Sequence, residues 1–363
     1  MTDVTSLVDD LDAGPSLHDF AKLSKGDPAP YWLFRGVCAA WGIEASSARI
    51  DLITVSENAT FVLYINGKRE GVVRVSQPGY VGGPEAVASE LSWLAALHDV
   101  DDVSLIDPVP TVRGTFVASI RDFRGSVWTV ISTKFVEGTV LEDLGDPAEY
   151  YQTIGTWAAK FHNQARHWKP PFNFKRFTWN TTDMVGQSPR WGRWENADLS
   201  PDDRAACDEA LARALSVVRR YPVNERTWGI IHADLRPSNI IRRPDGRLTV
   251  IDFDDCGYSY YLYDYASSLS FVEHEPYAPA MAQSWARGYQ QITPLTEQDF
   301  DLMSALSMIR RMQMLGWTIT HRKDALPDGL ADQQAPGSVL CARRYLDDPR
   351  WLLHEGEGVE PLG

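Results

Sequence analysis

Apolar and polar positions follow two different periods along the chain. Between Arg49 and Phe135, short apolar runs alternate with polar turns, which is the pattern of β-strands. One of these turns is Asn66-Gly67, and both residue types adopt the left-handed backbone that a two-residue hairpin turn requires. Helical periods occur at 28–41, before this region, and at 86–99, within it. The first part of the chain is therefore predicted to be mostly antiparallel β-sheet.

Beyond Gly138 the helical period dominates. It covers 150–165, 202–220 and most of 263–353, whereas 168–200 is rich in Trp, Pro, Gly and Asn and is predicted to be an irregular insert. We predict an α+β fold with a small antiparallel β lobe and a larger, mainly α lobe. The expected boundaries are 1–26 for a flexible acidic N-terminal arm, 27–136 for the β-rich lobe and 137–363 for the helical lobe.

Composition and charge exclude several classes of function and say less about the fold. Hydrophobic residues make up 44% of the 363 residues, which suffices for a core, and the formal net charge is −14. Such a surface repels phosphate backbones, so we expect neither nucleic-acid nor membrane partners. The charge also suits cationic ligands, although an acidic surface needs no ligand to explain it. The four Cys show no CxxC spacing, and neither a secretory signal nor a run of about 20 apolar residues is present, so we expect a cytoplasmic protein without a disulfide framework or zinc site.

One segment of the second part carries candidate chemistry. An apolar strand leads to His232 and Asp234, Asn239 follows five positions after Asp234, and a hairpin turn leads into a strand that ends at Asp252. This order places an acid, an amide and a second acid at the ends of neighbouring strands. Carboxylate and amide oxygens are hard ligands for Mg²⁺, and phosphoryl transfer needs an acid that orients the attacking hydroxyl. Each residue type is also common in ordinary turns, but all three at these spacings are hard to obtain by chance.

These residues resemble the motif of the aminoglycoside phosphotransferase-like (phosphotransferase enzyme) family. The family pattern is H-x-D-x-x-x-x-N, followed by an apolar strand and I-D-F-D/E. Here 232–239 is His-Ala-Asp-Leu-Arg-Pro-Ser-Asn and 251–254 is Ile-Asp-Phe-Asp, with Ala233 in place of the Gly that often follows the His. The resemblance covers residues 28–350, and around 74–94 the chain is especially similar to the stress-response kinase branch.

The resemblance implies a protein-kinase-like two-lobed fold and a role for each motif residue. Asp234 would be the catalytic base, and Asn239 and Asp252 would be the metal ligands. His232 would support the loop by hydrogen bonding. Asp264 matches a family position that ties this loop to a helix, although a helix cap explains it equally well.

The resemblance also implies how the β-rich lobe would bind a nucleotide. Arg74 stands where the family usually has a phosphate-binding Lys, and it would pair with Glu90, an acid on the apolar face of helix 86–99. The polar turn 56–60 would replace a Gly-rich loop, and 135–136 would contact adenine at the lobe connector. The predicted nucleotide-binding residues are Ser56, Asn58, Arg74, Glu90, Phe135 and Val136.

We therefore expect an ATP- and Mg²⁺-dependent kinase whose acceptor is a hydroxyl of a small molecule, aminoglycoside-like, amino alcohol or amino acid. The acceptor candidates are Trp191, Trp194, Asp198, Asp255, Glu273 and Arg311, although packing and solvation explain them at least as well. Two alternatives stay open: a protein Ser/Thr kinase of the stress-response type, and a nucleotide-binding pseudokinase that acts as a regulator. The sequence leaves the acceptor, the choice between ATP and GTP, and the oligomeric state undetermined.

Overall fold

The computed structural model describes residues 17–20, 22–76, 82–145, 148–320 and 329–354, and the chain divides into two compact units. Unit 1 comprises Met1–Ala95, Ile106–Glu137 and Pro170–Arg176. Unit 2 comprises Ala96–Leu105, Gly138–Lys169 and Phe177–Gly363. Most of the predicted N-terminal arm, residues 1–16, lies outside the described residues.

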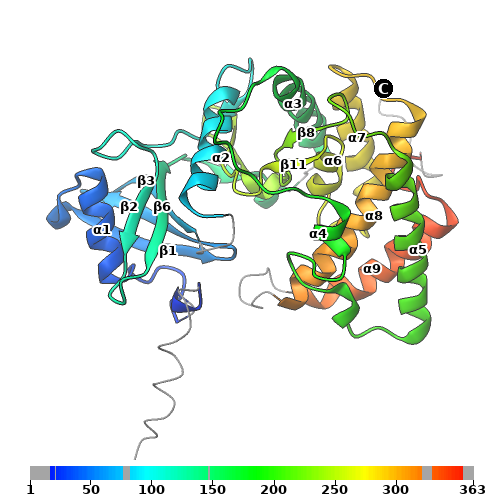
Figure 1. Ribbon diagram of the computed structural model, residues 1–363, viewed down its shortest axis with the longest axis horizontal. Helices are drawn as coiled ribbons and strands as arrows, with labels where there is room; N and C mark the ends of the chain where they lie inside the picture. The colour runs from blue at the N-terminus through cyan, green and yellow to red at the C-terminus, as the bar shows by residue number, and fades with distance from the viewer. Residues whose placement is uncertain (1–16, 21, 77–81, 146–147, 321–328, 355–363) are drawn as a thin grey trace, which may run out of the picture. The chain divides into compact units, whose positions relative to one another are not determined.

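Unit 1 is built on a five-stranded antiparallel sheet (Figure 1). In spatial order its strands are β1 (Ala48–Val55), β2 (Asn58–Ile65), β3 (Lys68–Ser76), β6 (Val127–Lys134) and β5 (Ala118–Arg121). Asn66 and Gly67 have φ angles of 50° and 78° between β2 and β3, so the predicted hairpin turn is confirmed. The strand predicted at 115–120 begins only at Ala118, because the Thr115 carbonyl closes a turn by accepting from the Thr111 N–H at 2.7 Å.

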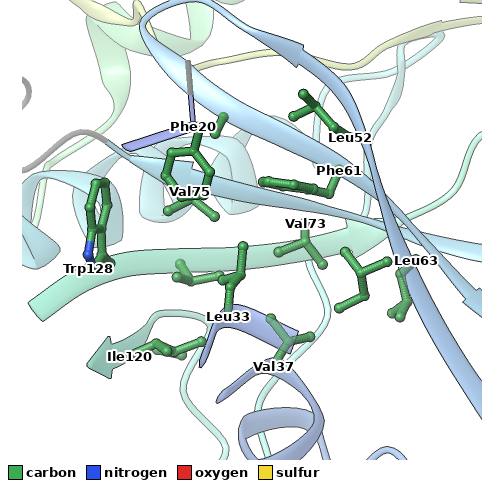
Figure 2. Packing of buried hydrophobic residues seen from close by; sticks show 14 of the residues in the cluster. Phe20, Leu33, Val37, Leu52, Phe61, Leu63, Val73, Val75, Ile120 and Trp128 are labelled. Carbon is green, nitrogen blue, oxygen red and sulfur yellow. The ribbon is translucent and has the colours of Figure 1, made fainter. Parts of the chain in front are cut away.

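Helix α1 (Tyr31–Trp41) packs its apolar side into the core of unit 1. It ends before Gly42, whose φ of 66° is the left-handed conformation that terminates helices. Figure 2 shows Leu33 and Val37 of this helix among the buried side chains of the sheet. Phe20 joins the same core from a short 3-10 helix, Leu17–Phe20, within the segment that the sequence assigned to the arm. Full burial of such side chains contributes about 1.5–3 kcal/mol each. A second helix, α2 (Pro84–Leu97), carries Glu90, and its last two residues are counted with unit 2.

Unit 2 is mainly helical (Figure 1). Its α-helices are α3 (Ala148–His167), α4 (Thr181–Val185), α5 (Pro201–Arg220), α6 (Tyr263–Ser268), α7 (Ala278–Gln290), α8 (Glu297–Thr320) and α9 (Leu330–Asp347). Helix α8 packs against α4, α5, α6 and α9. The segment 168–200 is irregular apart from α4 and a short 3-10 helix at Trp194–Asn196, as predicted.

Helix boundaries in unit 2 follow local chemistry. Ser200 caps α5 by accepting from the Asp203 N–H, Pro201 occupies the first turn, and Arg219 and Arg220 lie in the last turn, where cations favour the helix dipole. No helix in the described ranges combines the length and the apolarity that crossing a bilayer requires.

Two small sheets of unit 2 position the motif. The four-stranded sheet has the order β4 (Ser104–Leu105), β10 (Leu248–Val250), β9 (Ile240–Arg242) and β7 (Thr139–Val140), and β8 (Trp228–Ile231) pairs with β11 (Gly257–Tyr260). Residues 232–239 therefore connect β8 to β9, and residues 251–256 connect β10 to β11. We refer to 232–239 as the motif loop.

Candidate active site

A buried carboxylate anchors the beginning of the motif loop. Asp264, on α6, accepts the backbone N–H of His232 at 3.2 Å and that of Ala233 at 2.6 Å. The hypothesis that Asp264 ties the loop to a helix is therefore confirmed. His232 itself is buried, and its Nδ1 accepts the Asp234 N–H at 3.3 Å, so its ring supports the loop from within.

His162, on α3, is a third partner of Asp264. Its Nε2 lies 2.9 Å from Asp264 Oδ2, and its Nδ1 lies 3.0 Å from the Tyr289 hydroxyl. Burial lowers the pKa of His162, so the ring is neutral at pH 7. A carboxylate can only accept, so Nε2 carries the proton and donates to Asp264, and the Tyr289 hydroxyl donates to Nδ1. This network fixes the position of the loop backbone.

Ala233 adopts a backbone conformation that alanine disfavours. It is fully buried and has a φ of 65°, a left-handed conformation that costs a residue with a Cβ about 1–2 kcal/mol. The Gly that often occupies this place in the resembling family would not carry that cost. The two hydrogen bonds to Asp264 hold the strained backbone in place.

Asp234 is the hub of the site. Its Oδ2 accepts from Asn239 Nδ2 at 2.7 Å and from Arg236 Nε at 3.3 Å, and its Oδ1 accepts from Arg310 Nη2 at 3.2 Å. Its side chain is 17% exposed, whereas that of Arg310 is 1% exposed. Burial alone would raise the pKa of the Asp234 carboxyl, but the Arg236 and Arg310 guanidiniums outweigh burial and hold the pKa below its usual range. Asp234 is therefore ionised at neutral pH.

The structure places Asn239 and Asp252 at the same end of one strand pair. Asn239 immediately precedes β9, Asp252 follows β10 by two positions, and Val250 pairs with Ile240. The Ile251 N–H donates to the Asn239 carbonyl at 3.0 Å, which continues the pairing up to the two side chains. Neighbouring strands are about 4.8 Å apart, so these residues lie side by side.

The donor set of this pair fits Mg²⁺ better than a softer metal. Asn239 uses its amide nitrogen to donate to the Asp234 carbonyl and carboxylate, so its carbonyl oxygen is the atom suited to a cation. Asp252 adds carboxylate oxygens, one of which also accepts the Asp254 N–H at 3.2 Å. In the described part of the chain, no three His, Cys, Asp or Glu side chains form a metal-binding group. Mg²⁺ usually takes only one or two ligands from protein, together with phosphates and water.

The expected ion pair of unit 1 is present. Arg74 on β3 donates through Nη2 to both carboxylate oxygens of Glu90 on α2, at 2.8 and 2.7 Å, with side chains 11% and 3% exposed. Arg176, which the sequence reasoning missed, lies 3.9 Å from the same carboxylate and donates to the Ala86 carbonyl at 3.2 Å. Two guanidiniums therefore lie near one carboxylate.

The other predicted nucleotide-binding residues of unit 1 lie on two segments. Ser56 is exposed in the β1–β2 turn and donates its N–H to the Asn58 carbonyl at 2.9 Å. Asn58 was predicted to lie in this turn but is already the first residue of β2, buried and paired with Ser76. Phe135 and Val136 are half-buried directly after β6.

The proposed acceptor candidates contribute mainly to the fold of unit 2. Trp191 and Trp194 are buried. Glu273 and Arg311 form a buried ion pair of 2.8 Å, so neither is presented to a ligand from the surface. Asp198 is exposed and Asp255 is buried, and the Trp191 ring centre lies 5.1 Å from the Arg310 guanidinium, which donates to Asp234.

Sequence reasoning missed the cations that surround Asp234 and the second cation near Glu90, Arg176. Arg310 lies in α8, within a continuous run of buried positions from Leu302 to Trp317. A charged residue inside such an apolar run needs a partner, and that signal could have pointed to Arg310. Arg236 is part of the motif itself, but no spacing rule indicated that its side chain turns back toward Asp234.

Comparison with known proteins establishes the class. Over 88% of this chain and 98% of the other, the structure matches a microcompartment-associated aminopropanol kinase with 29% identity and a TM-score of 0.77. It also matches the amicoumacin kinase hAmiN in complex with AMP-PNP, Ca²⁺ and Ami over 86% of this chain and 92% of the other, with 16% identity and a TM-score of 0.67. The fold is therefore the protein-kinase-like α+β fold that the sequence predicted.

The family follows from the sequence match. The Phosphotransferase enzyme family matches residues 52–300, and the chain belongs to this family. The amicoumacin kinase of Bacillus subtilis (strain 168) is 23% identical over 52% of this chain, which spans about half, 54%, of that protein. The homoserine kinase of Rhizobium meliloti (strain 1021) is 25% identical over 70% of this chain and 74% of that protein. The protein is accordingly an enzyme, a phosphotransferase of the kinase class, and its relatives are small-molecule kinases.

Proposed function

We propose that the protein transfers the γ-phosphoryl group of ATP to the hydroxyl of a small amino alcohol or amino acid, with Mg²⁺ as cofactor. The acceptor oxygen forms a bond to the γ-phosphorus, the bond from this phosphorus to the β–γ bridging oxygen breaks, and ADP leaves. The hydroxyl proton passes to Asp234. The observation that carries the proposal is the ionised Asp234 carboxylate, held by Asn239, Arg236 and Arg310 on an anchored loop.

Asp234 acts mainly by orienting the acceptor. A carboxylate whose pKa is held low is a weak base, so it cannot remove the hydroxyl proton early in the reaction. Phosphoryl transfer tolerates this, because its loose transition state needs little charge on the attacking oxygen. The carboxylate aligns the hydroxyl by accepting its hydrogen bond and takes the proton as the new bond forms.

Asn239 and Asp252 are the proposed Mg²⁺ ligands. The ion, when bound, would neutralise charge on the phosphate oxygens. In unit 1, Arg74 is held by the Glu90 carboxylate, and its guanidinium is a suitable donor to phosphate oxygens, which favours the proposal that Arg74 contacts nucleotide phosphates. Ser56, Asn58, Phe135 and Val136 remain the proposed contacts to the rest of the nucleotide.

The acceptor class is inferred from the relatives and from the charge of the chain. Aminopropanol and homoserine, the compounds in the names of two similar kinases, both carry a hydroxyl and an amino group. The net charge of −14 attracts a cationic amino alcohol over distances of about one Debye length, roughly 8 Å at physiological ionic strength, but not homoserine, which is a zwitterion without net charge. On the names of these two relatives, we place amino alcohols and amino acids ahead of larger aminoglycoside-like acceptors.

The test is a phosphorylation assay of the purified chain with ATP, Mg²⁺ and single acceptors. We expect product with 1-amino-2-propanol or homoserine and none with 2-propanol, which has the hydroxyl of 1-amino-2-propanol but lacks the amino group. Phosphorylation of added proteins on Ser or Thr in place of small molecules would favour the stress-response alternative. Nucleotide binding without turnover on any acceptor would favour the pseudokinase alternative.

A further inference from the structure

Unit 2 contains a pocket of about 530 Å³ that none of the proposed catalytic residues lines. Its walls come from α3, α7, the start of α8, the segment before β8 and the segment after β11. The residues that matter for its chemistry are Arg166, Arg226, Tyr221, Tyr261, Tyr289 and Thr296. Pockets for small organic ligands have about this size, roughly 300–1,000 Å³.

Strand β8 separates the pocket from the candidate active site. Thr227 lines the pocket at the beginning of β8, and His232 begins the motif loop at its end. Five residues of β-strand span about 16 Å. The pocket is therefore a site of its own and no extension of the place where Asp234 lies.

Two cations of this pocket have no acidic partner. Arg166 donates to Asn163 Oδ1 at 2.9 Å and to the Arg226 carbonyl at 3.3 Å, and its guanidinium lies 4.7 Å from the centre of the Tyr261 ring. Among the residues that the structure describes, neither Arg166 nor Arg226 forms an ion pair with a carboxylate. Both guanidiniums line the pocket and are therefore available to an anion bound in it.

The acid of the pocket is already engaged. Asp299 accepts from the Tyr221 hydroxyl, and it also accepts from the N–H and the hydroxyl of Thr296, each at 2.7 Å. The pocket therefore offers two guanidiniums and several hydroxyls over walls that include Leu262, Leu295 and Leu302. We infer that this pocket binds a small organic anion, with a carboxylate or phosphate head on the arginines and an apolar body against the leucines.

A chain of buried hydrogen bonds links this pocket to the motif loop. The Tyr289 hydroxyl donates to His162 Nδ1 at 3.0 Å, and His162 Nε2 donates to Asp264 at 2.9 Å. Asp264 in turn holds the backbone N–H groups of His232 and Ala233. A ligand that restrains Tyr289 therefore also restrains the loop that carries Asp234, which makes the pocket an effector site.

The binding test uses the full chain and isothermal titration calorimetry, with ADP and Mg²⁺ at saturating concentration to occupy the nucleotide site. The probes are phenyl phosphate and benzoate, which share an anionic head on an aromatic ring, and the neutral benzyl alcohol serves as their control. We expect saturable binding of at least one anion and binding of benzyl alcohol at least tenfold weaker. The better of the two anions identifies the head group.

Variants assign that binding to the pocket. Arg226→Ala changes an exposed side chain, so the fold is preserved, and we expect the anion to bind at least tenfold more weakly; Arg166→Gln should act in the same direction. Arg219→Ala, an exposed arginine on α5 outside the pocket, should bind like the wild type. Equal binding by Arg226→Ala and wild type, or no saturable binding of either anion, would overturn the inference.

Amide hydrogen exchange tests the coupling between the pocket and the motif loop. Binding should slow amide hydrogen exchange at His232 and Ala233, because their N–H groups belong to the restrained network. Binding that leaves exchange at these two amides unchanged would overturn the effector role. Neither measurement depends on turnover, so failure here is distinct from failure of the proposed kinase reaction.

Discussion

At the level of single residues, the protonation state of Asp234 depends on the balance of charges around it. Burial would favour the neutral acid, and two arginines reverse that preference. Arg236 comes from the motif loop and Arg310 from α8, so the ionised state of one carboxylate depends on segments far apart in the sequence. Arg310 is held in turn by Tyr263 and Ser270, each at 2.9 Å.

Arg310 is therefore expected to position Asp234. Arg310→Met removes the charge but keeps most of the side-chain volume, and it leaves Tyr263 and Asp234 with one partner fewer. We expect kcat to fall by about 10–100-fold, the range of a misplaced catalytic group, with the KM for nucleotide little changed. Arg310→Lys should recover part of kcat, because it restores the charge without the second arm of the guanidinium.

Steady-state kinetics of both variants checks this expectation, and circular dichroism confirms that they are folded. A merely structural role would lower the amount of folded enzyme and leave kcat per folded molecule unchanged. Equal kcat in Arg310→Met and wild type would contradict the positioning role.

Asp252 is expected to act through the metal. Asp252→Ala removes one of the two proposed protein ligands of Mg²⁺, so nucleotide should bind more weakly in the presence of Mg²⁺ and nearly unchanged in its absence. Calorimetric titration of ADP with and without Mg²⁺ measures the difference. Asp245→Ala, at an exposed hairpin turn between β9 and β10, is the matched control. If Mg²⁺ changes the affinity for ADP equally in wild type, Asp252→Ala and Asp245→Ala, then Asp252 does not bind the metal.

At the scale of elements, the motif loop is strained where it meets α6. Ala233 adopts a left-handed backbone at a fully buried position. Ala233→Gly removes a cost of about 1–2 kcal/mol but makes the unfolded chain more flexible by about 0.4–1 kcal/mol. We expect a small net gain in the free energy of unfolding.

Ala233→Val is expected to change the free energy of unfolding in the opposite direction. A β-branched side chain at a positive φ and without free space should destabilise the fold by at least about 2 kcal/mol. Urea denaturation of the two variants and the wild type gives the comparison. Similar urea midpoints for Ala233→Val and Ala233→Gly would mean that residue 233 does not have a positive φ in solution.

The sequence predicted elements whose signals are local. The Asn66-Gly67 turn and the end of the first helix at residue 41 depend on neighbouring residues, and the structure contains both. The order of Asp234 and Asn239 was also readable, because both lie in one loop.

The parts that could not be predicted arise from tertiary contacts. The positive φ of Ala233, on which the effect of replacing Gly at this position depends, is held by Asp264, which lies on another element. Arg176 reaches Glu90 from a segment that looked irregular, and no periodicity connects the two. The acceptor candidates were chosen by residue type, and the burial of Trp191 and Trp194 follows from packing that residue type does not reveal.

At the scale of the whole molecule, buried histidines couple stability to pH. Burial lowers the pKa of both His162 and His232, so both are neutral when the chain is folded. In the unfolded chain each has an ordinary pKa of about 6.5. Below that pH the unfolded chain binds protons that the folded chain does not, so stability is lost as the pH falls through about 6.5 and is unaffected by these groups above about 7.5.

The measurement is the free energy of unfolding between pH 5 and pH 8. Each such histidine contributes a slope of up to about 1.4 kcal/mol per pH unit below its unfolded pKa. We expect His162→Gln to reduce the slope relative to wild type. A slope in His162→Gln as steep as that of the wild type would show that His162 is protonated in the folded state.

The most direct test of the account compares Asp234→Asn with wild type and with Arg219→Ala, an exposed control. The measurement is the rate of phosphorylated product formation from ATP and the best acceptor, with nucleotide affinity determined on the same samples. Asn keeps the shape of Asp234 but cannot accept the hydroxyl proton, so we expect kcat to fall by about 10²–10⁴-fold while the nucleotide still binds. Turnover of Asp234→Asn at the wild-type rate would contradict the assignment of Asp234 and, with it, the proposed reaction.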